Sequence, residues 1–318
     1  MAVEKSDNWQ SVTEVVVGEG GDGQRLDNFL MKHLKGVPKS HIYRIVRKGE
    51  VRVNKGRCQN KRKLMCGDTV RIPPIRLEQQ ESLTPSASLL QLLRRSVLFE
   101  DDRFLFLDKP AGVAVHGGSG VSHGVIEGLR QLRPDAPYLE LAHRLDRDTS
   151  GCLVIAKRRS ALRAFHGLTQ SGGIDKRYRA LVMGVWQGGE RSVNAPLLKR
   201  NTLSGERIVT VSPSGKMART LFRPLTQYRQ GSLLEVKLVT GRTHQIRVHA
   251  KHIGHPLAAD PKYGDAQYNQ QMTDLGLKRV FLHAHSIRFT LPEIFTYDLV
   301  APLPEGLQQL LQRLEPIT

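Results

Sequence analysis

The hydrophobic pattern near the start of the chain has the spacing of two short amphipathic helices. Positions 26, 29, 30, 33 and 34 share one helix face, and a second helix capped by Ser40 buries positions 42, 45 and 46. Alternating residues follow at 51–53 and 67–73, on either side of a turn signal at 54–56. These segments predict a compact module over residues 17–75, after a tail of residues 1–16.

A second pattern begins after a linker at 76–93, which is rich in Gln, Ser and Glu and can end in a short helix. From Phe104 it predicts a strand, a turn, a second short strand and a glycine loop. Helical segments are expected near 124–132, from an N-cap at Ser160, from an N-cap at Thr243, and over 305–314. We therefore expect a second, larger α+β domain over residues 94–318.

The run CLVIA at 152–156 predicts a strand buried on both faces, because it is short, continuous and apolar. The polar segment HRLDRDTSG at 143–151 would lie at the mouth of that strand. A solvated turn with ion pairs is one interpretation of its composition. However, Thr149, Ser150 and Gly151 tie the segment to a rigid strand. An ionised Asp146 between arginines would then suit nucleophilic or base chemistry on an anionic polymer.

The chain carries 48 Lys and Arg against 30 Asp and Glu, a formal net charge of +18. This excess predicts a polyanionic partner, nucleic acid above all. Between residues 32 and 63 twelve basic residues accompany one acid, and the apolar face of the second helix forces its cations onto the other faces. The predicted nucleic-acid contacts are Lys39, Arg44, Arg47, Lys48, Arg52 and Lys55.

Other patterns exclude several classes of protein. The three cysteines, Cys58, Cys66 and Cys152, form no CxxC pair, which favours reduced thiols in the cytoplasm. No apolar run has the length of a membrane span, and the first ten residues lack the apolar core of a signal peptide. We therefore expect a cytoplasmic protein without a membrane partner.

Two further motifs suggest bound groups only at first sight. Four histidines crowd positions 244–255, but they give no HExxH spacing and have no adjacent acidic ligand. The glycine loop at 116–120 lacks the GK[ST] ending and the GxGxxG spacing of phosphate loops. We expect neither a metal nor a cofactor.

Three segments resemble the motifs of one enzyme family, the pseudouridine synthases that modify ribosomal RNA. They are HRLDRDTSG at 143–151, KRYRALVMGVW at 176–186 and GRTHQIRVH at 241–249, in the family's order. DKPAGVAVH at 108–116 is similar to a family element that packs under the first motif. Residues 25–54 resemble the alpha-L RNA-binding module. The resemblance implies a mixed, mainly antiparallel extended sheet with flanking helices, preceded by a small RNA-binding domain.

The resemblance also implies roles for individual residues. Asp146 would be the catalytic carboxylate, Arg247 would hold it through a forked pairing, and the ring of Tyr178 would pack on the target base. Pattern alone favours a buried core tyrosine at position 178. Arg144 would fill the space that the base vacates, and His143 is expected to join it in binding the substrate.

The implied activity is the isomerisation of specific uridines in large-subunit (23S) ribosomal RNA, at several sites including some near the peptidyl transferase centre. A monomer would act on this RNA, free or in an assembling particle. The sequence leaves open whether Asp146 attacks the sugar or removes a proton from C2′. One alternative, a non-enzymatic ribosome-assembly factor, leaves the three motifs unexplained. A second alternative, an RNA glycosidase, would need another carboxylate, for which Asp148 is available.

Overall fold

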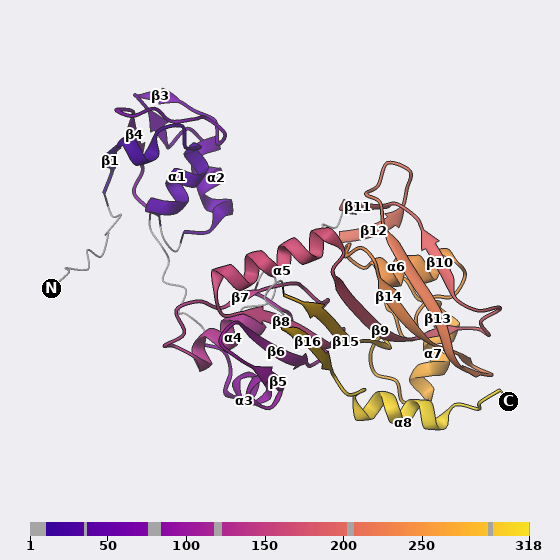
Figure 1. The fold of residues 1–318 in the computed structure, drawn as a ribbon. Helices are drawn as coiled ribbons and strands as arrows, with labels where there is room; N and C mark the ends of the chain where they lie inside the picture. The colour runs from indigo at the N-terminus through magenta and orange to yellow at the C-terminus, as the bar shows by residue number, and fades with distance from the viewer. Residues whose placement is uncertain are drawn as a thin grey trace. The chain divides into compact units, whose positions relative to one another are not determined.

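The computed structural model describes residues 11–34, 37–75, 84–117, 123–201, 207–291 and 295–317. It divides into two compact units, Met1–Leu83 and Thr84–Thr318, and each is described by itself (Figure 1). Most of the predicted glycine loop and residues 76–83 of the predicted linker lie outside the described residues.

The first unit contains a small antiparallel sheet of order β1-β4-β2-β3 and two helices. The sheet and the helices bury one common hydrophobic core. Asn54 and Lys55 have positive φ angles of 50° and 66° and make the two-residue turn between β2 and β3. The elements are β1 (Thr13–Val16), η1 (Glu19–Gly21), α1 (Leu26–His33), α2 (Lys39–Arg47), β2 (Arg52–Val53), β3 (Gly56–Arg57) and β4 (Thr69–Ile72).

The predicted apolar faces of both helices form the core of this unit. Leu26 and Leu30 of α1 pack in one buried cluster with Ile42 and Ile45 of α2. Strand β1 pairs with β4 along its whole length, so the unit's first boundary moves from residue 17 to Thr13. The two helices and the short strands lie where the hydrophobic pattern placed them.

The second unit is built on a ten-stranded mixed sheet with main order β10-β13-β14-β9-β15-β8-β6-β5. Its pairings are antiparallel except for β8 with β15, which confirms the predicted fold class. The strands are β5 (Val97–Glu100), β6 (Phe104–Lys109), β7 (Glu140–Leu141), β8 (Ser150–Ala156), β9 (Ile174–Met183), β10 (Arg191–Asn194), β13 (Arg219–Tyr228), β14 (Gly231–Leu238), β15 (Leu282–Thr290) and β16 (Thr296–Val300).

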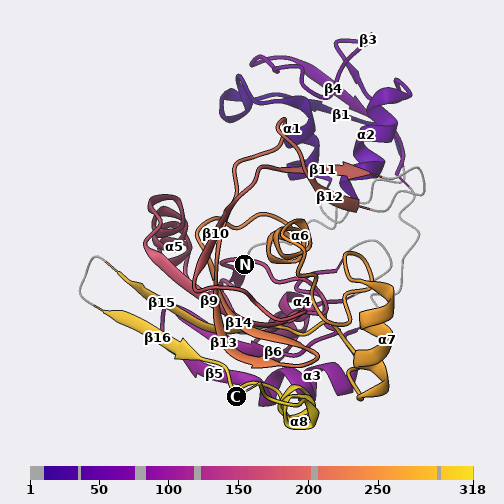
Figure 2. The ribbon, with the colours of Figure 1, turned by 90° about the vertical axis from the view of Figure 1, so that its right-hand side faces the viewer.

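Helices cover both faces of this sheet, and a separate two-stranded ribbon accompanies it (Figure 2). No helix in the described parts of the chain is long and apolar enough to cross a membrane. The helices are α3 (Ala87–Arg95), α4 (Val125–Leu132), α5 (Arg159–Ser171), α6 (Gln245–His252), α7 (Ala266–Asp274) and α8 (Glu305–Arg313), and the ribbon is β11 (Leu197–Asn201) with β12 (Arg207–Val211).

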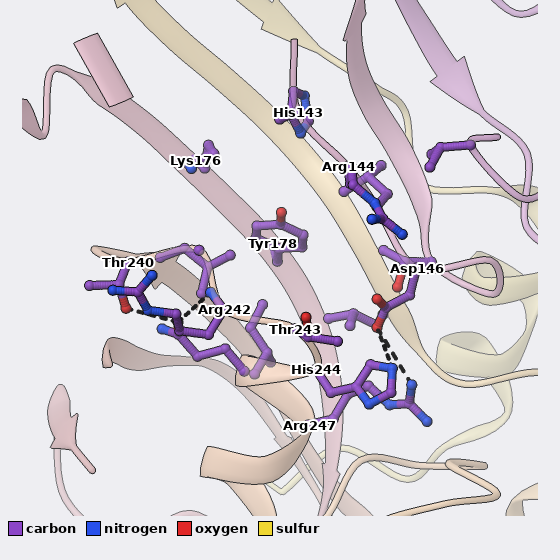
Figure 3. A pocket seen from close by; sticks show the side chains of 18 of the residues that line it. His143, Arg144, Asp146, Lys176, Tyr178, Thr240, Arg242, Thr243, His244 and Arg247 are labelled. Atoms are coloured by element: carbon purple, nitrogen blue, oxygen red, sulfur yellow. Dashed lines mark hydrogen bonds and ion pairs between the residues drawn. The ribbon is translucent and has the colours of Figure 1, made fainter. Parts of the chain in front are cut away.

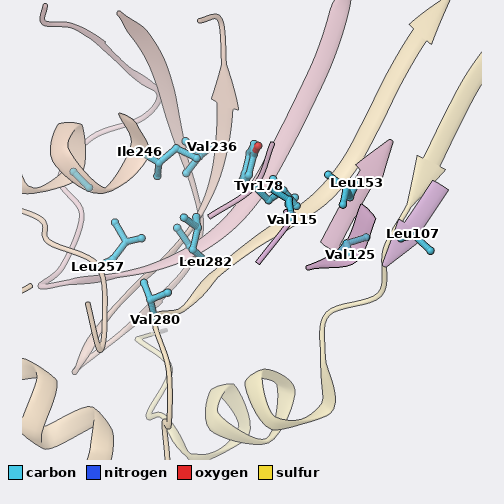
Figure 4. Close-up of a cluster of buried hydrophobic side chains, with 14 of the residues drawn as sticks. Leu107, Val115, Val125, Leu153, Tyr178, Val236, Ile246, Leu257, Val280 and Leu282 are labelled. Atoms are coloured by element: carbon cyan, nitrogen blue, oxygen red, sulfur yellow. The ribbon is translucent and has the colours of Figure 1, made fainter. Parts of the chain in front are cut away.

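Strand β8 is buried at every residue, as its apolar run predicts. Leu153 and Ile155 belong to the cluster that includes α4 and α6, part of which Figure 4 shows. Cys152 and Val154 belong to the cluster on the other face, which includes α5. Because both faces of β8 are fixed by packing, the polar loop that enters it starts from a rigid position.

Three local predictions were wrong. The segment after residue 112 forms no second strand where the structure describes it. None of the serine and threonine caps is used: the cap positions of α2, α5 and α6 are Pro38, Arg158 and His244, and no side chain caps them. Helix α3 begins at Ala87 and packs within the second unit, so the predicted linker extends too far.

Gly151, at the start of β8, has a positive φ of 108°, and a Cβ there would collide with the backbone of Ala284 in β15. We expect Gly151→Ala to lower the free energy of unfolding by about 2 kcal/mol or more, through backbone strain and overpacking. Urea denaturation measures this loss. The control is Gly167→Ala in α5, where the added Cβ meets open space and should stabilise the helix by up to about 1 kcal/mol. Equal effects of the two substitutions would contradict the explanation.

Candidate active site

A cavity of about 1450 Å³ brings the three predicted motifs together (Figure 3). It exceeds the roughly 300–1,000 Å³ of small-molecule pockets, so it has room for more than one nucleotide. Among its charged lining residues, cations outnumber carboxylates. The carboxylates are Asp146 and Asp148, and the cations are Arg144, Arg147, Lys176, Lys199, Arg242, Arg247 and Lys262.

Asp146 lies in the loop that enters β8 and keeps 30% of its side chain exposed. Its Oδ2 atom is 3.5 Å from Nη1 of Arg247 and 3.9 Å from Nε2 of His244. The predicted pair of Asp146 with Arg247 is therefore present, but as one long contact. The carboxylate remains accessible from the cavity.

The fork of Arg247 is directed at Asp260 instead of Asp146, which corrects the prediction. Nε and Nη2 of Arg247 each donate a hydrogen bond of 2.7 Å to the two oxygens of Asp260. The backbone N–H groups of Lys262 and Tyr263 donate to the same carboxylate. Burial alone would lower the pKa of Arg247, but the bonds to Asp260 outweigh it and leave that pKa raised. Arg247 is thus locked by a fully buried partner.

His244 also lies beside Asp146, and Tyr263 contacts its ring. Val209 N–H donates to the hydroxyl of Tyr263, and Nδ1 of His244 is 2.8 Å from the same oxygen. Burial lowers the pKa of His244 more than the charge of Asp146 raises it. Nε2 of His244 is the atom that faces Asp146.

Tyr178 is a residue of β9 whose side chain belongs to the buried hydrophobic cluster and is 6% exposed. It also lines the cavity, and its hydroxyl makes no hydrogen bond with the described residues. Burial, and then the charge of Asp146, raise the pKa of Tyr178. The side chain is both a core tyrosine and a wall of the cavity, so its contact with a base stays a prediction.

His143 and Arg144 differ in how free they are to meet a substrate. Nε2 of His143 accepts the backbone N–H of Val154, and burial with the charge of Lys176 lowers the pKa of His143 to about 3. His143 therefore serves the fold of the loop. Arg144 is exposed and lines the cavity, and its side chain makes no hydrogen bond or ion pair with the described residues.

Two basic side chains, the buried Lys109 and the half-buried Arg279, hold the 143–149 loop. Lys109, fully buried, donates to the backbone oxygens of Pro110, Val113 and Arg147. Burial lowers its pKa to about 7, while the three oxygens accept all three protons of its charged form. Arg279 donates to the backbone oxygen of Asp148 and to Ser150 Oγ. The loop's backbone is thus fixed directly after Asp146, at residues 147 and 148.

The histidines near α6 have separate structural partners. His249 contacts Thr220 Oγ1 and the backbone oxygen of Ala195, and His255 contacts the backbone oxygen of Met183. Over the described ranges, no group of three His, Cys, Asp or Glu side chains is arranged to hold a metal.

Comparisons with known proteins identify the family. Residues 103–252 match the model of the RNA pseudouridylate synthase family, and residues 24–70 match the S4 domain. The ribosomal large subunit pseudouridine synthase C of Pasteurella multocida is 53% identical over 95% of this chain and 94% of its own. Its counterpart from Escherichia coli K12 is 52% identical over 96% of this chain and 97% of its own. The chain belongs to the RNA pseudouridine synthase family.

Solved structures support the same fold. Human RNA Pseudouridylate Synthase Domain Containing 4 is 26% identical with a TM-score of 0.59, covering 72% of this chain and 97% of its own. Human RNA Pseudouridylate Synthase Domain Containing 1 has the same TM-score at 24% identity, covering 70% of this chain and 89% of its own. Both correspond to less of the chain than the bacterial relatives do.

The S4 domain of this pseudouridine synthase carries the predicted basic face. Arg44, Arg47, Lys48 and Lys55 are exposed. Arg52 is half-buried and donates to the backbone oxygen of Lys55, so it also stabilises the hairpin. The side chain of Lys39 lies outside the described residues. Contact of this face with RNA stays a prediction.

Arg247→Lys should lower the turnover of the synthase about 10²-fold, because an ammonium cannot hold Asp260 through a fork and the contact with Asp146 would shift. Asp260→Asn should lower turnover in the same way, since it loosens the same fork without touching Asp146. Both are measured as kcat at a temperature where circular dichroism shows a folded protein. A fully active Asp260→Asn variant would mean that the fork does not position Arg247.

Proposed function

We propose that this synthase isomerises uridines to pseudouridine in large-subunit ribosomal RNA, with Asp146 as the reacting carboxylate. The observation that carries the proposal is the state of Asp146: it is exposed to a cation-lined cavity and held by one long contact. The names of the two bacterial relatives point to large-subunit RNA as the target.

The reaction rearranges bonds within one nucleotide. The bond from C1′ to N1 of uracil breaks, the base rotates, and C1′ joins C5. C5 loses its proton and N1 gains one, so atoms and electrons balance without a redox partner or cofactor. Asp146 acts on the ribose, either by attack at C1′ or by removal of the C2′ proton, and Arg247 with His244 stabilises its charge.

The target base must leave its stack to reach Asp146, at a cost of a few kcal/mol. The ring of Tyr178 offers a wall for the extracted base, and the freely exposed Arg144 can occupy the space that the base leaves. The target set is proposed to include several uridines, some near the peptidyl transferase centre. A monomer would act on the RNA, free or in an assembling particle.

A glycosidase has less support from the geometry. Asp148, the second carboxylate of the cavity, pairs with Arg147 at 3.1 Å. An activated water would need a free carboxylate.

Asp146→Asn should abolish isomerisation and leave RNA affinity within a few-fold, because the carboxylate acts on the ribose and does not hold the polyanion. Carbodiimide-dependent reverse-transcription stops on large-subunit RNA report the product. Asp148→Asn is the matched control and should keep the stops. Reverse-transcription stops that persist with Asp146→Asn would contradict a role of Asp146 in the reaction. The glycosidase would be favoured if wild type produced abasic sites in the RNA and Asp148→Asn did not.

Removal of residues 1–83 should weaken RNA binding and flatten the dependence of log K on log salt concentration. Each lost phosphate contact removes about 0.7 to 0.9 from that slope. The second unit has its own core and should turn over a short substrate slowly. Filter binding at four salt concentrations measures the slope. If the truncated, folded protein keeps the full slope, the basic face has another role.

A further inference from the structure

Lys176 stands in the cavity two residues before Tyr178 on β9. Alternate residues of a strand share a face, and both side chains line the cavity. Figure 3 shows Tyr178 between Lys176 and Asp146. The intervening residue, Arg177, pairs with Asp175 and Glu235 instead.

The ammonium of Lys176 has no counter-charge. It makes no hydrogen bond or ion pair with the residues that the structure describes, although it is half-buried. The other cations of β9 have carboxylate partners, since Arg177 and Arg179 both form ion pairs with Glu235. Burial lowers the pKa of Lys176, which means that the charged form is held at a cost. An unmatched, partly desolvated cation in a binding cavity favours an anionic ligand.

The position of Lys176 selects a part of the RNA. Two residues along a strand span about 6.6 Å, more than the thickness of one base. A base beside Tyr178 and Asp146 therefore leaves Lys176 facing the adjoining part of the strand. A compact ammonium binds phosphate as a point charge. The cavity of about 1450 Å³ has room for that neighbouring unit.

We propose that Lys176 binds a backbone phosphate next to the target nucleotide. This proposal rests on the function proposed above. The phosphate contact would hold the RNA strand in the cavity equally before and during the reaction, so Lys176 is a positioning residue and does not act on the reacting atoms. Its loss should then appear in binding and KM more than in kcat.

The test uses the full chain and a short oligoribonucleotide from large-subunit RNA that carries one uridine and that the protein binds. A series of this RNA has one linkage at a time replaced by an uncharged methylphosphonate. Lys176→Met should raise Kd about tenfold and lower the salt slope by about 0.7, with kcat at saturation nearly unchanged. Lys176→Arg should restore the slope. At one methylphosphonate position, wild type and Lys176→Met should bind equally.

Arg177→Met is the matched control, because it removes a cation from the adjacent residue that pairs with Asp175 and Glu235, and it should leave the slope unchanged. Lys176→Gln removes the same charge but keeps a polar side chain, so it tests the proposal even if the Met variant does not fold. An unchanged Kd and slope in Lys176→Met and Lys176→Gln would overturn the proposal, as would a defect that persists at every methylphosphonate. If the charge pairing is found but wild type makes no pseudouridine, the proposed function fails while the phosphate subsite stands.

Discussion

One guanidinium serves two carboxylates, and the site depends on how unequal they are. Asp260 is buried and receives two bonds from Arg247 and two backbone N–H groups. Asp146 receives one contact of 3.5 Å from the same arginine and remains 30% exposed. The two environments differ accordingly: the hydrogen bonds of Asp260 fix the arginine, whereas the carboxylate of Asp146 keeps unused acceptor capacity facing the cavity.

That division works only if the backbone on both sides of Asp146 is rigid. Before Asp146, Nε2 of His143 accepts the backbone N–H of Val154. After Asp146, Lys109 and Arg279 donate to the backbone oxygens of Arg147 and Asp148, and β8 holds the end of the loop within the sheet. On the opposite wall, Gln245 bonds Thr240, Arg242 and Thr220 and so fixes the start of α6. Two rigid walls therefore meet at the contact between Arg247 and Asp146.

The sequence predicted what depends on local pattern. The buried run of β8 and the motifs with Asp146, Tyr178 and Arg247 were readable because their signals are contiguous. Asp260 and Tyr263 were missed because they lie outside the three motifs, and only tertiary packing brings them to Arg247 and His244. Helix α7 was missed because its apolar face consists of two buried residues, too few for a periodic signal. Cap residues at Ser40, Ser160 and Thr243 failed since a hydroxyl one position from the boundary looks the same in sequence.

The basic residues of β9 and the cavity differ in whether they have a carboxylate partner, which composition alone does not reveal. Arg177 and Arg179 form ion pairs with Glu235, whereas Lys176 and Arg144 in the cavity have no partner among the described residues. Pairing the cavity cations would stabilise the free protein but would remove the charges that an RNA strand must meet. The unpaired cations resemble Asp146 in this respect. Both keep hydrogen-bonding capacity that no described residue uses in the free protein. The second unit therefore has unpaired cations in the same cavity as Asp146, independently of the exposed cations of the first unit.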